Sequence, residues 1–113
     1  EDALRISGGQ RMIIEQIRYF VADEQRDEVL NARREIDRFR EEVGVPSGHI
    51  LLSDATPADG PTIVWQCGYE DEGEMGLADA RLIGNEAYES ARERLSGLVQ
   101  RVELELYISD DGE

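Results

Sequence analysis

The last patterned segment of the chain, residues 102–108 (VELELYI), alternates strictly between two kinds of side chain. Successive side chains of a strand point to opposite faces of a sheet, so this alternation predicts a strand with one aliphatic face. That face would carry Val102, Leu104, Leu106 and Ile108. Because a row of four aliphatic side chains needs a cover, we expect a sheet with a layer of helices on this side.

The rest of the chain supplies the other strands. Residues 11–21 are rich in isoleucine and aromatic residues and are apolar on both faces, which is typical of a central strand. Residues 49–54 and 62–70 predict two further strands, on either side of the proline- and glycine-containing loop 55–61. Because that loop is short, the two strands are expected to pair as an antiparallel hairpin.

Two helical segments separate these strands. Residues 23–43 carry an apolar stripe at spacings of three and four residues, which predicts an amphipathic helix. A second helical region over 73–99 is interrupted at Gly84, and Asn85 can cap its second half. The charged side of the first helix is interpreted as solvent-facing, with Arg33, Arg34, Asp37, Arg40 and Glu41.

The predicted order of elements is βαββαβ, the split βαβ arrangement of ferredoxin-like α+β folds. Both helical segments would lie on one face of a four-stranded antiparallel sheet. The other face would carry large apolar residues that a single chain leaves exposed, so we expect a homodimer through this open face, with a lumen between two packed sheets. Residues 11–109 would form this single domain, with 1–10 as a flexible lead-in and 110–113 as a flexible acidic tail.

Composition excludes some function classes. The 113 residues include 26 acidic side chains against 12 arginines and no lysine, and the net charge is −14. Nucleic-acid phosphates repel such a chain, so no nucleic-acid partner is expected. No apolar run approaches the length of a membrane span, and the single cysteine, Cys67, suits a reducing cytoplasmic location. Two explanations of this charge balance carry equal weight: adaptation to high internal salt, and a GC-rich genome, which favours arginine codons over lysine codons.

Three stretches carry a resemblance to a known family: IIEQIRYFV (13–21), IVWQCGYEDEGE (63–74) and IGNEAYESARERL (83–95). These stretches resemble NIPSNAP-type members of the dimeric α+β barrel superfamily. The first is an opening strand before a charged helix, the second a tryptophan-containing strand before an acidic broken helix, and the third a capped half-helix with an aromatic residue. The likeness covers roughly residues 11–109. Some members of that superfamily are cofactor-free monooxygenases or isomerases, some bind haem, and many have no known activity. The resemblance therefore leaves open whether this chain is an enzyme.

The candidate ligand-binding residues of the lumen are Arg18, His49, Trp65, Glu103, Glu105 and Tyr107. His49, as a general base or haem ligand, and Glu103 are the candidate catalytic residues. In a closed lumen the pKa values of Glu103 and Glu105 would rise, which suits proton transfer. Arg18 would hold a ligand carboxylate or form a structural pair with a glutamate. The alternative for His49 and the glutamates is an ordinary polar strand surface.

Trp65, Cys67 and Tyr69 share one face of the third strand, where they would line a ligand pocket or fill the dimer core. Cys67 has no evident basic partner, so a nucleophilic role is not expected. No cofactor or metal motif is present. The leading hypothesis is a dimer that binds a small, partly apolar ligand in its lumen. The alternatives are a cofactor-independent monooxygenase or isomerase acting there and a purely structural dimer with a filled interior.

Overall fold

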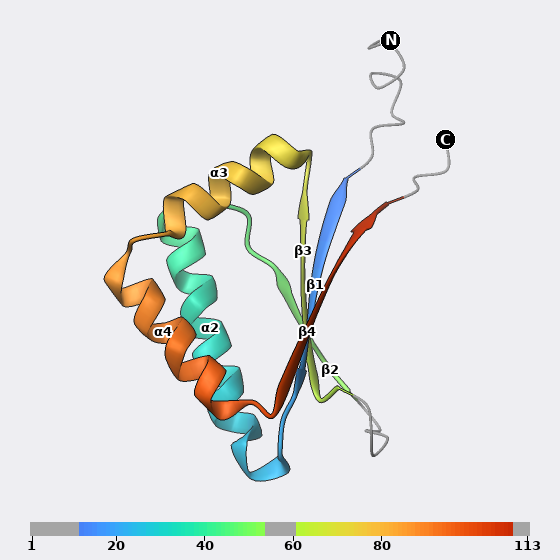
Figure 1. Cartoon of the computed structure of the whole chain (residues 1–113), viewed down its shortest axis with the longest axis vertical. Coiled ribbons are helices and arrows are strands. Elements are labelled where there is room, and N and C mark those ends of the chain that lie inside the picture. Colours follow the sequence, from blue (N-terminus) through green and yellow to red (C-terminus); the bar gives the residue numbers. More distant parts are fainter. Residues whose placement is uncertain (1–11, 54–60, 110–113) are drawn as a thin grey trace.

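The computed structural model describes residues 12–53 and 61–109. The elements run β1 (Ile13–Phe20), a 3-10 turn η1 (Asp23–Gln25), α2 (Arg26–Glu42), β2 (His49–Leu52), β3 (Ile63–Tyr69), α3 (Glu72–Leu82), α4 (Glu86–Leu98) and β4 (Arg101–Ile108). This order confirms the predicted ferredoxin-like α+β fold, and the helices lie together on one side of the sheet (Figure 1). The expected lead-in 1–10, most of the loop 55–61 and the tail 110–113 lie outside the described residues.

The four strands pair antiparallel in the order β2-β3-β1-β4, so β1 is central and β2 and β3 form the predicted hairpin. Ile17 of β1 lies opposite Trp65 of β3 and Leu104 of β4. Residues that face each other across a ladder share a face of the sheet, and their sequence neighbours lie on the other. Ile17, Trp65 and Leu104 therefore lie on one face, and Arg18 and its neighbour Glu103 lie on the opposite face.

Helix α2 has the predicted apolar stripe, but its charged side is not fully exposed to solvent. Arg33 and Arg40 were expected on the solvent-facing side, and each is only 4% exposed. Arg33 follows the buried Val29 by four residues, and Arg40 follows the buried Ile36 by four. Residues four apart lie on the same side of a helix, so both arginines point toward the sheet.

The second helical region is two helices, as predicted. The Asn85 side chain accepts a hydrogen bond from the backbone N–H of Tyr88 at 3.0 Å, which caps the first turn of α4. Gly84, just before the cap, has a φ of +88°, a conformation that glycine adopts without strain. The chain changes direction here, so α3 and α4 meet at an angle (Figure 1).

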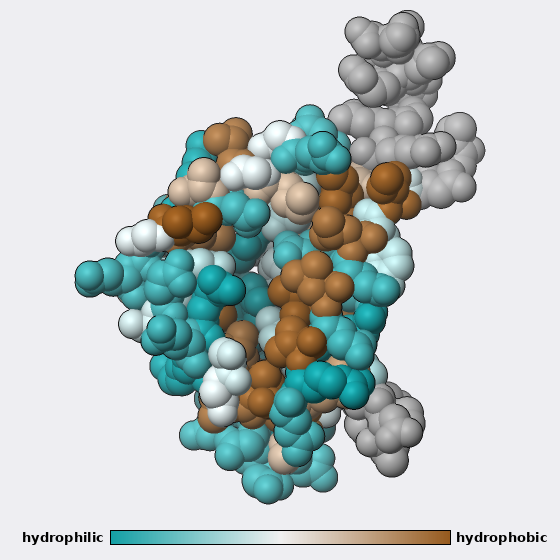
Figure 2. All heavy atoms as spheres, viewed as in Figure 1, coloured by the Kyte–Doolittle hydropathy of each residue, from teal (hydrophilic) through white to brown (hydrophobic). Residues whose placement is uncertain are grey.

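The core lies between the helices and the sheet and includes the fully buried Trp65, Tyr69, Ile63, Leu82 and Val29. The aliphatic face of β4 is on this helix side, as predicted, but the helices do not reach it. Val102, Leu104, Leu106 and Ile108 are 47%, 55%, 52% and 66% exposed. These four side chains form an apolar band along β4, and a row of brown atoms crosses the visible face of the molecule where β4 runs (Figure 2).

The open face of the sheet was expected to carry large apolar residues, and at its centre that expectation is wrong. Gln16 Nε2 donates to Gln66 Oε1 at 2.9 Å, and Arg18 Nη1 donates to Gln16 Oε1 at 2.6 Å. Arg18 also pairs with Glu103 and Glu105. This polar network forms because the alternation of β1, β3 and β4 places all five side chains on the same face.

Candidate functional site

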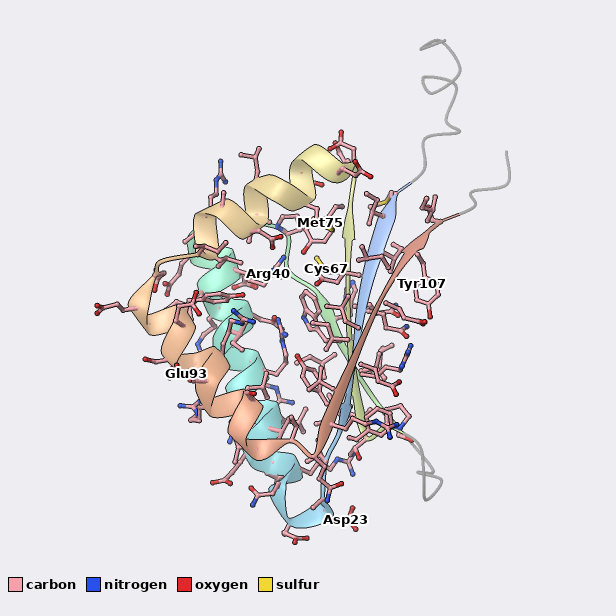
Figure 3. The ribbon with its side chains drawn as sticks, in the orientation of Figure 1. Asp23, Arg40, Cys67, Met75, Glu93 and Tyr107 are labelled. Carbon is pink, nitrogen blue, oxygen red and sulfur yellow. The ribbon has the colours of Figure 1, made fainter. Side chains whose placement is uncertain are left out.

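A cavity of about 470 Å³ lies between the sheet and the helices. Strands β1, β3 and β4 form one wall and helices α2, α3 and α4 the other, with Ile17, Trp65, Leu104, Arg33, Leu82 and Tyr88 among the lining residues. Figure 3 shows Arg40 on the helix side of the sheet, near Cys67, and Tyr107 on the opposite side. The cavity therefore lies on the face opposite to the one where the lumen was predicted.

Trp65 is held in the cavity wall by two arginines and a carboxylate. The guanidinium carbons of Arg33 and Arg40 lie 4.0 Å and 5.1 Å from the ring centroid. Trp65 Nε1 donates to Asp37 Oδ1 at 3.0 Å, and Arg33 Nη2 donates to the same oxygen at 2.9 Å. The indole thus has a fixed orientation and contacts buried positive charge, which cation–π attraction favours.

Arg40 is connected to Glu15 through a tyrosine. Arg40 Nη2 donates to the Tyr69 hydroxyl at 2.8 Å, and that hydroxyl donates to Glu15 Oε1 at 3.0 Å. Burial strongly raises the pKa of Tyr69, so an uncharged phenol stands between Arg40 and Glu15. Burial alone would lower the pKa of Arg40, but Tyr69 and Cys67 outweigh it and this pKa is raised. Arg40 therefore remains a buried cation.

Cys67 has a basic neighbour that the sequence did not reveal. Its sulfur lies 3.8 Å from Arg40 Nη2. Burial nevertheless raises the pKa of the thiol, and the opposing effect of Arg40 is smaller. The prediction that Cys67 has no basic partner is wrong, while the thiol remains in its protonated, weakly nucleophilic form.

The structure divides the predicted site residues between two faces. Trp65 lies on the helix side and lines the cavity. The other five, which lie on the open face, are Arg18, His49, Glu103, Glu105 and Tyr107. The sheet itself separates Trp65 from them, so the six residues do not form one site within a chain.

On the open face, Arg18 forms the structural pair that the sequence allowed. Its Nε lies 3.2 Å from Glu103 Oε1, and its Nη2 lies 3.3 Å from Glu105 Oε1. The Tyr107 hydroxyl and Arg18 lower the pKa of Glu105. The predicted rise of this pKa, which assumed a closed lumen, is not found in the single chain because the carboxylate is stabilised by donors and remains in contact with solvent.

Sequence reasoning missed the charged cavity residues Arg33, Arg40 and Glu15. The spacing of four residues from buried aliphatic positions was the available signal for the two arginines. Within residues 12–53 and 61–109, no group of three His, Cys, Asp or Glu side chains could hold a metal ion. In the same residues, no helix is both long and apolar enough to span a membrane.

No protein-family model matches the sequence, and no curated protein does. Among solved structures, a NIPSNAP family protein from Agrobacterium tumefaciens is 20% identical, with a TM-score of 0.68 over 90% of this chain and 89% of that one. A dimeric protein of unknown function and ferredoxin-like fold from Bacteroides fragilis is 13% identical, with a TM-score of 0.61 over 85% and 94% of the two chains.

A third solved structure is a Nitrosomonas europaea protein whose name assigns it provisionally to antibiotic biosynthesis monooxygenases. It is 15% identical, with a TM-score of 0.61 over 92% of each chain. At these identities the likeness concerns the fold. The chain therefore has the ferredoxin-like α+β fold of NIPSNAP family and dimeric ferredoxin-like proteins, as its sequence predicted.

Proposed function

We propose that the chain binds a small, partly apolar molecule in the cavity between the sheet and the helices. The observation that carries this proposal is a preformed space of about 470 Å³, whose lining combines aliphatic side chains and one fixed indole with a few charged groups. Ligand pockets have volumes of roughly 300–1,000 Å³ and are mostly apolar with a few oriented polar groups. This site replaces the predicted lumen as the place for the ligand and keeps Trp65 as a contact.

Trp65 is the single tryptophan of the chain and lies in the cavity wall, so it reports directly on binding. N-phenyl-1-naphthylamine is a neutral probe that fluoresces in apolar surroundings and accepts excitation energy from tryptophan at short range. We expect it to bind saturably, with energy transfer from Trp65. A purely structural protein with a filled interior would show no saturable transfer.

A matched pair of substitutions on α4 localises the probe. Ser96 lines the cavity, and Ser90 lies on the exposed side of the same helix. Ser96→Phe places a ring at the cavity and is expected to weaken probe binding several-fold, whereas Ser90→Phe leaves it unchanged. Equal binding by both variants would place the probe elsewhere and contradict the proposed site.

We further propose that the chain works as a homodimer through the open face of the sheet. The neighbour from Bacteroides fragilis is described as dimeric, which supports a dimer of the same fold. No helix of the described residues covers this face, and its polar centre is surrounded by apolar side chains, among them Ile14, Phe20 and Val64. Pairing two copies would cover it.

A cofactor-independent oxygenase or isomerase is the second candidate, and the Nitrosomonas protein supports it at the level of fold. Its predicted participants, Arg18, His49 and Glu103, lie on the open face and would act only in a lumen between two copies. Alanine substitution of His49 and of Glu103 tests it. Catalysis in the lumen requires that at least one of the two substitutions lowers the turnover of a substrate. If the protein only binds a ligand in the cavity, ligand binding by both variants should be unchanged.

A further inference from the structure

We propose that the ligand of this cavity carries an acid group, such as a carboxylate, and that Arg40 binds it. The inference rests on the proposed function because it concerns the same cavity. It adds the charge class of the ligand and the side chain that selects it.

Among the described residues, one arginine of the cavity lining has no carboxylate partner. Arg33, Arg40 and Arg92 contribute to the lining with two carboxylates, Glu15 and Asp79. Arg33 pairs with Asp37 and Arg92 with Glu89, which leaves Arg40. The whole chain has a net charge of −14. A cation without a carboxylate partner inside a cavity of such a chain attracts an anionic ligand and gives it an orientation.

Arg40 has donors left for a ligand. Its Nε donates to the Pro46 carbonyl at 2.8 Å and its Nη2 to the Tyr69 hydroxyl, and both acceptors are neutral. Within residues 12–53 and 61–109, Arg40 forms no ion pair with a carboxylate, and its Nη1 makes no hydrogen bond. A cation that is 4% exposed and lacks a direct counter-charge is costly, so an anion bound at Nη1 would be strongly favoured.

Arg33 contributes a second positive charge near Arg40. It lies over the same indole ring as Arg40, and its Nε is buried without a hydrogen-bond partner in the described part of the chain. Its other nitrogens donate to the Tyr19 hydroxyl and to Asp37. The ion pair with Asp37 neutralises Arg33 in part. Among the described residues, Arg40 is therefore the buried arginine of the lining that forms no ion pair. The acid group is therefore assigned to Arg40, with the apolar body against Trp65 and the aliphatic wall.

Glu15 does not fill this role. The neutral Tyr69 hydroxyl stands between its carboxylate and Arg40, at 3.0 Å from the former and 2.8 Å from the latter. An ion pair through an intervening hydroxyl is weaker than a direct charge-assisted contact. A ligand carboxylate that contacts Nη1 would make the direct contact without displacing Tyr69.

The test compares 4-phenylbutyrate with 4-phenylbutyramide, which has the same apolar body and no charge. Isothermal titration calorimetry at neutral pH is expected to show the carboxylate binding to the unmodified protein at least about tenfold more tightly than the amide. Arg40→Gln should reduce that ratio to near one while the affinity for the amide stays the same. Arg38→Gln removes an exposed arginine of the same helix and should keep the full ratio.

Each outcome bears on a separate claim. An amide that binds the unmodified protein as tightly as the carboxylate would overturn the acid assignment and leave cavity binding intact. A ratio that survives Arg40→Gln would overturn the role of Arg40. If that variant fails to fold, Arg40→Lys, which keeps the charge and loses the fork of donors, should lower the ratio below that of the unmodified protein. If neither probe nor N-phenyl-1-naphthylamine binds, the proposed function itself is wrong.

Discussion

The guanidinium carbon of Arg33 lies 4.0 Å from the centre of the Trp65 ring, and both side chains are almost fully buried. Asp37 joins them, because its Oδ1 accepts hydrogen bonds from Trp65 Nε1 and from Arg33 Nη2. One carboxylate oxygen thus fixes the cation over the ring and the ring in the wall of the cavity. The wall of the site and the stability of the core depend on the same contacts.

Arg33→Met is expected to lower the free energy of unfolding by about 2–3 kcal/mol. It removes a desolvated cation–π contact worth about 2 kcal/mol and leaves the carboxylate of Asp37 without its charged partner. Urea denaturation followed by Trp65 fluorescence measures the change. Arg34→Met, at an exposed position of the same helix, should change stability by less than about 0.5 kcal/mol. Equal losses from the two variants would contradict a role for the stack.

Two glycines give a matched pair for the packing of Trp65. A Cβ at Gly48 would lie 2.4 Å from Trp65 Cε2 and 2.5 Å from the Gln66 carbonyl oxygen, whereas a Cβ at Gly76 meets nothing within 4 Å. Gly48→Ala should therefore cost about 1–3 kcal/mol and shift the Trp65 emission, because the indole must move. Gly76→Ala, inside α3, should stabilise by up to about 1 kcal/mol. An unchanged emission in Gly48→Ala would show that the indole is not tightly held.

Stability is expected to fall in alkaline solution. Burial raises the pKa of Cys67, Tyr69 and Tyr88 above their ordinary values of 9.0 for the thiol and 10.0 for the phenols. A raised folded-state pKa means that the unfolded chain releases its protons first, so the contribution is complete below the ordinary value and is lost as pH rises beyond it. The free energy of unfolding should decline from about pH 9 upward.

Tyr69→Phe provides the control for that pH dependence. Without the Tyr69 phenol, the alkaline decline should become shallower, while Cys67 and Tyr88 still contribute. At neutral pH the same variant should lose about 1–3 kcal/mol, because the hydroxyl that connects Arg40 and Glu15 is gone. A flat profile above pH 9 in the unmodified protein would contradict the burial of these three groups.

Two strand substitutions distinguish the surfaces that could pair two copies. Val64 lies on the open face, opposite Arg18, and Leu106 belongs to the apolar band of β4 on the other face. Light scattering should show a dimer for the unmodified protein and for Leu106→Arg, and a monomer for Val64→Arg, because a second cation beside Arg18 would be buried between the sheets. The reverse pattern would place the interface on the band of β4, and a monomeric unmodified protein would remove the dimer altogether.

The fold was predictable because strand and helix periods are local properties of the sequence. The alternation over 102–108 identified the aliphatic face of β4, and Asn85 identified the start of α4 correctly. The exposure of Leu104 was not predictable in the same way. Alternation shows which residues share a face, but the width of the helical layer over that face depends on how the helices pack.

The site was less predictable because it depends on contacts between distant segments. Arg33 and Arg40 were placed in solvent because burying a charge is costly, and no local pattern shows that Trp65 and Tyr69, on another element, compensate that cost. Trp65 was expected in the same lumen as Arg18 because the sequence of a strand does not show how it pairs with its neighbours. A slip of one residue exchanges the two faces of a strand, so only the observed register separates these two residues.

The measurement that tests the account most directly is a crystal structure with bound 4-(4-bromophenyl)butyrate, in which the anomalous signal of bromine locates the ligand. We expect the bromine on the helix side of the sheet, in the cavity beside Trp65, with the carboxylate at Arg40 Nη1. Bromine between two copies on the open face, near Arg18 and His49, would contradict the proposed cavity site and support the lumen instead.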